Sequence, residues 1–217
     1  MCGIAGFYSN RLASDDNTSL VEGMLNSIKK RGPDDHGVWQ KGAINLGHRR
    51  LSIHDLSMSG HQPMQSSSGR YHVVFNGEIY NFEQLRTKLD FSNWKGTSDT
   101  EVLLECIEQF GLKSALNEFN GMFAFAVWDE DLQELTLARD RFGEKPLCYY
   151  FSDDIFAFAS EITSLESLEF LDLTINKSAL THHIETSYIP SPLSIYSKVN
   201  KLPPGQFLTF STSKGIE

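Results

Sequence analysis

The stretch that most constrains the fold is the apolar run at residues 121–129, Gly-Met-Phe-Ala-Phe-Ala-Val-Trp-Asp. Large apolar side chains alternate in it with alanines, so both faces of a strand formed here are apolar. A strand with two apolar faces has to lie inside the molecule, with other elements packed against each face. The small alanine side chains allow one of those elements to come close. The run therefore predicts the centre of a sheet.

The remaining apolar patterns predict strands and helices around this centre. Alternating or short continuous apolar runs indicate strands, and apolar residues three or four positions apart indicate helices. The charged turn at residues 140–146 is too short for a helix and is interpreted as structural. The predicted strands are residues 3–8, 37–40, 43–48, 71–75, 134–139, 147–151, 155–159 and 206–210, and the predicted helices include residues 18–30 and 178–186.

Composition limits the class of protein. The chain has 217 residues, of which 40% are hydrophobic, enough for one large globular domain with a buried core. Its formal net charge of −9, with no basic run, argues against nucleic acid or an anionic membrane as a partner. The sequence shows neither a signal-peptide pattern nor 18 consecutive apolar residues, so we expect a cytoplasmic protein.

The cysteines suggest one reactive group and two core residues. Cys2, Cys106 and Cys148 are odd in number and lack the CxxC spacing of the usual zinc clusters, which suits a reducing compartment. Cys106 and Cys148 are expected to fill the core. Removal of Met1 would leave Cys2 with a thiol of pKa roughly 8.5 beside an α-amine of pKa roughly 7.7–8.0, a nucleophile with its own base. An inert cysteine is the alternative that this pair leaves open.

Two polar stretches are ambiguous from the residues alone. Arg49 and Arg50 follow a predicted strand and would face opposite ways, so one of them can point into a site. Asn76 and Gly77 follow another predicted strand, where Asn-Gly normally forms a turn. The same two residues could instead supply an amide and a backbone N–H that converge on one oxygen.

Two segments resemble helix-capping boxes. Asn81 with Gln84 forms one, and Ser98 with Glu101 forms the other, ahead of an apolar helical stripe. Asp99 then lies in the first turn of that helix, where the helix dipole favours a carboxylate. A carboxylate at this position is explained equally well by the helix dipole and by a role in a functional site.

The motifs taken together resemble the glutaminase half of glutamine-dependent asparagine synthetases. Several of them are individually weak, but they occur in the family's order from Cys2 to Phe210. The motifs are Met1-Cys2-Gly3-Ile4-Ala5-Gly6, Arg31-Gly32-Pro33-Asp34, residues 47–53, Asn76-Gly77-Glu78-Ile79-Tyr80-Asn81, Ser98-Asp99-Thr100-Glu101, Gly121-Met122-Phe123-Ala124-Phe125, Arg139-Asp140-Arg141-Phe142-Gly143 and Leu202-Pro203-Pro204-Gly205.

The resemblance implies a fold and a mechanism. The fold is an α+β, four-layer αββα sandwich of the N-terminal-nucleophile hydrolase type, with two antiparallel sheets between helix layers. The activity is that of a class II glutamine amidotransferase, in which Cys2 attacks the side-chain amide of glutamine. The Asn76 side chain and the Gly77 N–H form the oxyanion hole.

The resemblance also implies how the amino-acid end of glutamine is held. Arg50 binds the α-carboxylate, Glu78 and Asp99 bind the α-ammonium, and Arg49 is the solvated neighbour. A zwitterion needs a fork-shaped cation and separate carboxylates, so these assignments make chemical sense. The substrate-binding residues implied in this way are Arg50, Leu51, Ile53, Asn76, Gly77, Glu78 and Asp99.

The family pattern further suggests a longer parent protein. We expect residues 1–210 to be the glutaminase domain and residues 211–217 the start of a linker to an ATP-dependent synthetase domain, in the same or another chain. The Ser-Gly-Gly-x-Asp-Ser loop of that domain is absent from this sequence. No cofactor or metal is expected in this chain, and ATP and Mg are expected only in the synthetase domain. The expected partners are L-glutamine and the synthetase domain, and a homodimer is one arrangement that we expect to be open to the chain.

Other functions stay open. The parent could pass ammonia to a different acceptor, such as a surface-polysaccharide sugar, instead of making asparagine. A different N-terminal-nucleophile amidotransferase or acylase is a further possibility, although residues 50–53 and 78–81 favour the asparagine-synthetase branch. A non-catalytic interface module is opposed by the intact set of site residues. Release of glutamate from glutamine distinguishes an enzyme from a binding module.

Overall fold

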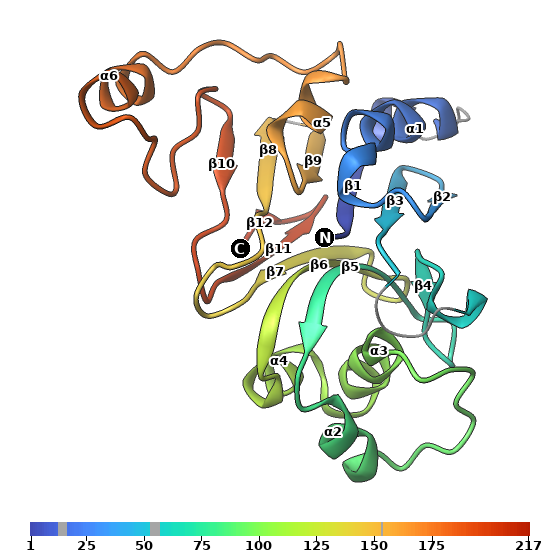
Figure 1. The fold of residues 1–217 in the computed structure, drawn as a ribbon. Coiled ribbons are helices and arrows are strands. Elements are labelled where there is room, and N and C mark those ends of the chain that lie inside the picture. The colour runs from blue at the N-terminus through green and yellow to red at the C-terminus, as the bar shows by residue number, and fades with distance from the viewer. Residues whose placement is uncertain (13–16, 53–56, 153) are drawn as a thin grey trace.

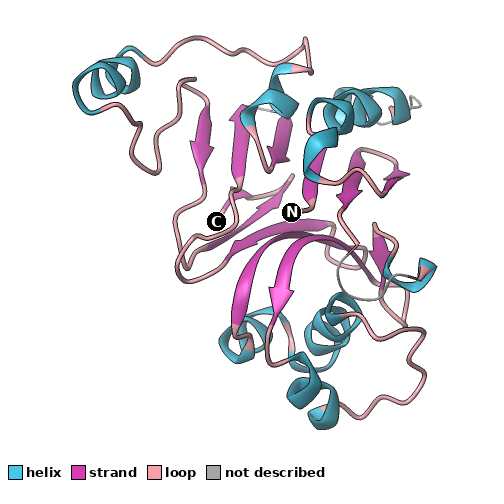
Figure 2. Cartoon of the chain, in the orientation of Figure 1, coloured by secondary structure: helices cyan, strands magenta, loops and turns pink. Residues whose placement is uncertain are grey.

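A computed structural model describes residues 1–12, 17–52, 57–152 and 154–217. Within them, two antiparallel sheets of six strands each lie face to face (Figure 1, Figure 2). The order of the first sheet is β10 (Val199–Lys201), β8 (Cys148–Ser152), β9 (Ile155–Ala159), β1 (Gly3–Ser9), β3 (Ile44–Arg50) and β2 (Asp35–Lys41). The order of the second is β12 (Gly215–Ile216), β11 (Phe207–Ser211), β7 (Glu134–Arg139), β6 (Gly121–Asp129), β5 (Tyr71–Ile79) and β4 (Met64–Gln65).

Helices cover the outer faces of both sheets. Helices α1 (Thr18–Ser27) and α5 (Ile162–Glu166) lie on the first sheet. Helices α2 (Phe82–Lys88), α3 (Asp99–Phe110) and α4 (Leu112–Glu118) lie on the side of the second sheet (Figure 1). Helix α6 (Lys177–Thr186) projects from the first sheet's side, and short 3-10 turns form at Asn10–Leu12, Lys29–Arg31 and Met58–Gly60.

Three apolar cores separate the four layers. The middle core lies between the two sheets. One outer core lies between the first sheet and helices α1 and α5, and the other lies between the second sheet and helices α2, α3 and α4. Burial of apolar area in these cores is the main term that stabilises the layers. The predicted four-layer αββα sandwich is therefore confirmed.

Strand β6 lies inside the molecule, as its two apolar faces predict. Phe123 and Phe125 pack in the core under α3 and α4, whereas Ala124 and Ala126 face the other sheet. Because the alanines are small, the first sheet can approach β6 closely on that face. Strand β5 pairs with β6 along its whole length.

The turn interpretation of Asn76 and Gly77 is wrong. Strand β5 continues through both residues, and its ladder with β6 extends to Ile79 opposite Gly121. A Cβ atom on residue 77 would lie 2.3 Å from the carbonyl oxygen of Met122, so only glycine fits this close approach. The tertiary pairing thus overrides the local preference of Asn-Gly for a turn.

One predicted capping box forms in part and the other does not. Ser98 caps α3, since its Oγ accepts a hydrogen bond from the N–H of Glu101 at 3.3 Å. No side-chain cap bond forms at Asn81, whose amide instead donates to the carbonyl of Glu118 at 2.9 Å. Its oxygen accepts from the N–H of Asn120, so Asn81 joins two loops.

The expectation that Arg49 is solvated is also wrong. Arg49 is 5% exposed, and its Nε donates to the carbonyl of Leu25 while its Nη2 donates to Asn26 Oδ1 at 2.6 Å. These acceptors lie in the last turn of α1, where a cation complements the helix dipole. Arg49 therefore fastens α1 to β3, while Arg50 faces the other way.

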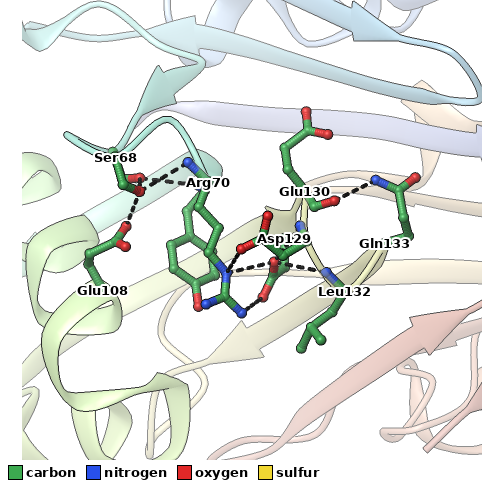
Figure 3. Close-up of polar contacts among 10 residues, drawn as sticks. Ser68, Arg70, Glu108, Asp129, Glu130, Leu132 and Gln133 are labelled. Carbon is green, nitrogen blue, oxygen red and sulfur yellow. Dashed lines mark hydrogen bonds and ion pairs between the residues drawn. The ribbon is translucent and has the colours of Figure 1, made fainter.

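A charged network holds the end of β5 that is remote from Asn76 (Figure 3). Arg70 and Asp129 form a bidentate pair, with Nη2 to Oδ2 at 2.7 Å and Nε to Oδ1 at 2.9 Å. Asp129 Oδ1 also accepts from the N–H of Leu132 in the turn after β6. Ser68 Oγ links this network to α3 by donating to Glu108. The network fixes where β5 begins relative to β6.

Candidate active site

Cys2 lies directly before β1, a strand held between β9 and β3 in the middle of the first sheet. The N–H of Leu51 donates to its sulfur at 3.4 Å, and the sulfur lies 3.7 Å from the carbonyl oxygen of Leu51. Burial raises the pKa of the thiol, and this outweighs the lowering by the Leu51 N–H, the chain's N-terminal charge and Arg50. The resting sulfur is therefore a thiol that needs a base.

Arg31 fixes the backbone of Cys2. Its Nε donates to the carbonyl of Cys2 at 2.9 Å, and its Nη1 forms an ion pair with Glu161 at 2.7 Å. Sequence reasoning missed this role and gave Arg31 no function beyond its place in a family motif. The signal that was available is the Arg31-Gly32-Pro33-Asp34 motif itself.

One cavity of about 150 Å³ brings together the predicted site residues. It opens between the sheets, at the start of β1 and beside the second half of β5. Ile53 falls outside the described residues. The predicted residues that line the cavity are Cys2, Arg50, Leu51, Asn76, Gly77, Glu78 and Asp99.

Within the part of the chain that the structure describes, two hydrogen-bond donors in the cavity lack acceptors. Asn76 is 1% exposed, and its Nδ2 is buried without a partner among the residues that the structure describes. The pairing register places Gly77 opposite Phe123, but Phe123 uses its own N–H and C=O for Asp140, at 3.2 and 2.8 Å. The N–H of Gly77 consequently points away from β6, to the side that the cavity occupies. Two unpaired donors of this kind suit a developing oxyanion.

The charged side chains of the cavity are held by the backbone. Arg50 is 7% exposed, and its Nη1 donates to the carbonyl of Ser57 at 2.9 Å. Asp99 Oδ2 accepts from the N–H of Ile79 at 2.9 Å, which joins the start of α3 to β5. A guanidinium together with the carboxylates of Glu78 and Asp99 gives the cavity the charges that complement a zwitterion.

The cavity also contains residues that sequence reasoning missed. His48, Gln62 and Lys145 line it, and all three are buried. His48 lies two positions before Arg50 on β3, so strand alternation places both on the same face. That alternation was the available signal for His48, whereas nothing local in the sequence pointed to Gln62 or Lys145.

The other cysteines are core residues, as predicted. Burial raises the pKa of Cys106 and that of Cys148 to about 12, and Cys148 Sγ donates to the carbonyl of Ala159 at 3.1 Å. Across the described ranges, no group of three or more His, Cys, Asp or Glu side chains is arranged to hold a metal ion. No helix in the same ranges has both the length and the apolar character needed to cross a membrane.

The fold, a four-layer sandwich with Cys2 at the start of a central strand, is shared with a protein of known structure. A solved structure of this fold, glutamine phosphoribosylpyrophosphate amidotransferase from B. subtilis, superimposes with a TM-score of 0.74. It is 20% identical, and the match covers all of this chain and 48% of that one. At this identity the likeness establishes the fold alone.

The chain belongs to the glutamine amidotransferase domain family, which matches residues 1–216. It is 36% identical to a putative asparagine synthetase (glutamine-hydrolyzing) 2 of Methanocaldococcus jannaschii, over 99% of this chain and 45% of that protein. It is also 36% identical to asparagine synthetase (glutamine-hydrolyzing) 1 of Bacillus subtilis, over 96% of this chain and 33% of that protein. The chain thus spans less than half the length of these relatives.

Proposed function

We propose that this chain hydrolyses L-glutamine to L-glutamate and ammonia through a thioester on Cys2, after Met1 is removed. The observation that carries the proposal is that one cavity brings together Cys2, the donors of Asn76 and Gly77, and the charged side chains of Arg50, Glu78 and Asp99. Membership of the glutamine amidotransferase domain family supports the choice of substrate.

The reaction starts with the thiol of Cys2. The freed α-amine accepts the thiol proton, and the sulfur attacks the side-chain carbonyl carbon of glutamine. The carbonyl electrons move onto oxygen, which receives hydrogen bonds from Asn76 Nδ2 and the Gly77 N–H. When the carbonyl re-forms, the C–N bond breaks, and the nitrogen leaves as ammonia with the proton that the amine had taken.

Water completes the cycle. The α-amine takes a proton from a water molecule, the oxygen attacks the thioester, and the C–S bond breaks. The sulfur recovers its proton from the amine, and glutamate leaves. Because burial keeps the pKa of the thiol high, the adjacent amine has a necessary role in both halves of the reaction.

The opposite end of glutamine binds through its charges. The Arg50 guanidinium presents a fork to the α-carboxylate, and the carboxylates of Glu78 and Asp99 face the α-ammonium. Leu51 and Ile53 contribute backbone contacts. Because separate side chains bind the α-carboxylate and the α-ammonium, the substrate must carry both charged groups. The site therefore selects glutamine over simple amides.

The ammonia is used by an ATP-dependent synthetase domain, in the same or another chain, which makes asparagine from aspartate. The names of the relatives and their greater length support this proposal. In it, ATP and Mg belong to the synthetase domain, and the glutaminase residues act without either. A cytoplasmic location and a homodimer complete the proposal.

The test combines turnover with labelling. The chain should release glutamate from glutamine without ATP or Mg, and a glutamine-shaped diazoketone should form one adduct, on Cys2. Excess glutamine should protect Cys2, while Cys106 and Cys148 remain unmodified because they are buried. Labelling that spreads over all three cysteines, or that glutamine does not reduce, would contradict the proposal.

A further inference from the structure

One edge of β5 extends beyond its strand partner, next to the cavity. Strand β4 pairs Met64 with Val73 and Gln65 with His72, and no strand in the described part of the chain runs beside residues 75–79 on that edge (Figure 1). Buried backbone groups without a strand partner need other hydrogen bonds. The side chains that supply them decide how firmly this part of β5 is held.

Two buried side chains bind both backbone groups of Phe75. Gln62 Oε1 accepts from the N–H of Phe75 at 2.7 Å, and His48 Nε2 lies 3.1 Å from its carbonyl oxygen. A carbonyl can only accept, so His48 must carry a proton on Nε2. The amide nitrogen of Gln62 in turn donates to Thr100 Oγ1 at 3.3 Å, which connects Phe75 to α3.

Gly77 lies between two fixed positions on this edge. Phe75 is bound by Gln62 and His48, and the N–H of Ile79 is bound by Asp99. Gly77 has no side chain of its own to hold it, and a Cβ there would clash with the Met122 carbonyl. The ladder with β6 turns its N–H toward this edge, and the bonds at Phe75 and Ile79 hold the edge on either side of it.

We propose that His48 and Gln62 are positioning residues for the oxyanion hole, which replace the missing strand beside Phe75 and so aim the Gly77 N–H and the Asn76 amide at the attacked carbonyl. The inference rests on the proposed glutaminase function. A donor that is already in place needs no reorganisation when the oxyanion forms, and that is what gives it catalytic value.

His48 is suited to such a role and not to proton transfer. It is 1% exposed, and burial lowers its pKa to about 3, so the ring stays neutral near pH 7. A neutral ring keeps the donor on Nε2 without adding another buried positive charge to the cavity that Arg50 and Lys145 line. We call His48 and Gln62, both bonded to the backbone of Phe75, the clamp.

The first test compares substitutions that remove or retain the clamp. Gln62→Leu and His48→Phe each remove one bond to Phe75, whereas Gln62→Glu keeps an acceptor oxygen. The first two variants should lower kcat for glutamine by about 10–10²-fold with KM nearly unchanged, because only the transition state uses the oxyanion hole. Gln62→Glu should recover most of the loss.

Gln65 provides the matched control. It lies on β4, its amide donates to the carbonyl of Gly69 at 3.2 Å, and it does not line the cavity. Gln65→Leu should therefore keep the kcat of the unaltered chain. Equal kcat in Gln62→Leu, His48→Phe and Gln65→Leu would overturn the clamp, as would a loss that only follows lowered thermal stability.

The second test does not depend on glutamine turnover. Hydrogen exchange of the Phe75 amide should become faster in Gln62→Leu and stay slow in Gln62→Glu. If the unaltered chain fails to hydrolyse glutamine, the proposed function is wrong, and Phe75 exchange still decides whether the clamp exists. Unchanged protection of the Phe75 amide in Gln62→Leu would overturn the clamp. If Gln62→Leu does not fold, the kcat and KM of His48→Phe decide whether the clamp exists.

Discussion

The carboxylate of Asp99 accepts a hydrogen bond from the backbone N–H of Ile79 at 2.9 Å, so the first residue of α3 is bonded to β5. Asp99 also lines the cavity that holds Cys2. In the proposed function this side chain has two tasks, which are to fasten a strand and to present a negative charge to the substrate. The two tasks can be separated by substitution.

Asp99→Asn should keep an acceptor for Ile79 but lose the charge. We expect KM for glutamine to rise by about 10–10²-fold, the effect of losing a charged hydrogen-bond partner, with stability close to that of the unaltered chain. Asp99→Ala should raise KM and also lower the free energy of unfolding. Steady-state kinetics and urea unfolding of both variants check this, and an unchanged KM in Asp99→Asn would remove Asp99 from substrate binding.

Retention of Met1 should abolish most activity. With Met1 attached, the nitrogen of Cys2 is an amide and cannot act as a base, which should lower the rate by about 10²–10⁴-fold. Intact mass and glutaminase rate measured on the same preparation test this. A fully active preparation in which every molecule still carries Met1 would exclude the mechanism.

Asn76→Ala should lower kcat more than it affects KM. The substitution removes one of two donors to the oxyanion, and such losses typically cost about 10²–10³-fold in kcat. KM should stay close to its original value, because the ground-state carbonyl makes little use of the donor. A strongly raised KM with kcat intact would make Asn76 a substrate-binding residue instead.

Arg50→Lys tests recognition of the α-carboxylate. Lysine keeps the positive charge but loses the planar fork, so KM for glutamine should rise. The matched comparison is an amide that lacks the α-carboxylate. The unaltered chain and the variant should hydrolyse this amide equally slowly. Efficient turnover of that amide by the unaltered chain would refute the assignment of Arg50.

The Arg70–Asp129 pair should make stability depend on pH. Burial tends to raise the pKa of Asp129. The hydrogen bonds from Arg70 and from the N–H groups of Leu132 and Asp131, together with the charge of Arg70, outweigh burial, so the pKa in the folded state is below its usual value. The stabilisation is then complete above the unfolded pKa of roughly 3.9 and is lost as the pH falls through the folded value. Asp129→Asn should cost about 1–3 kcal/mol at pH 7. In urea titrations this difference should shrink below about pH 4.

The sequence was most informative where burial and pattern agree. The alternation in residues 121–129 predicted β6, and motifs far apart in the chain predicted residues that the structure brings into one cavity, from Cys2 to Asp99. The small strands β4 and β10 were not predicted individually, because two or three residues carry no measurable period.

Other features depended on partners distant in the sequence. The local sequence predicts a turn at Asn76 and Gly77, but pairing with β6 makes both residues part of a strand. Arg49 was expected to be solvated, but it is buried and donates a hydrogen bond to the end of α1. Gln62 acts through the backbone of Phe75, 13 positions away, across a contact that no local pattern encodes. Sequence reasoning predicted most of the polar groups that line the cavity and missed those that hold the strand beside it.

The open edge of β5 also bears on how this protein avoids self-association. An exposed strand edge is a template on which another chain can pair and begin to aggregate. Here Gln62 and His48 bond both backbone groups of Phe75, and Asp99 bonds the N–H of Ile79. An incoming strand would therefore find these ladder positions already occupied. The same arrangement that leaves one N–H available to a small molecule thus denies the edge to another polypeptide.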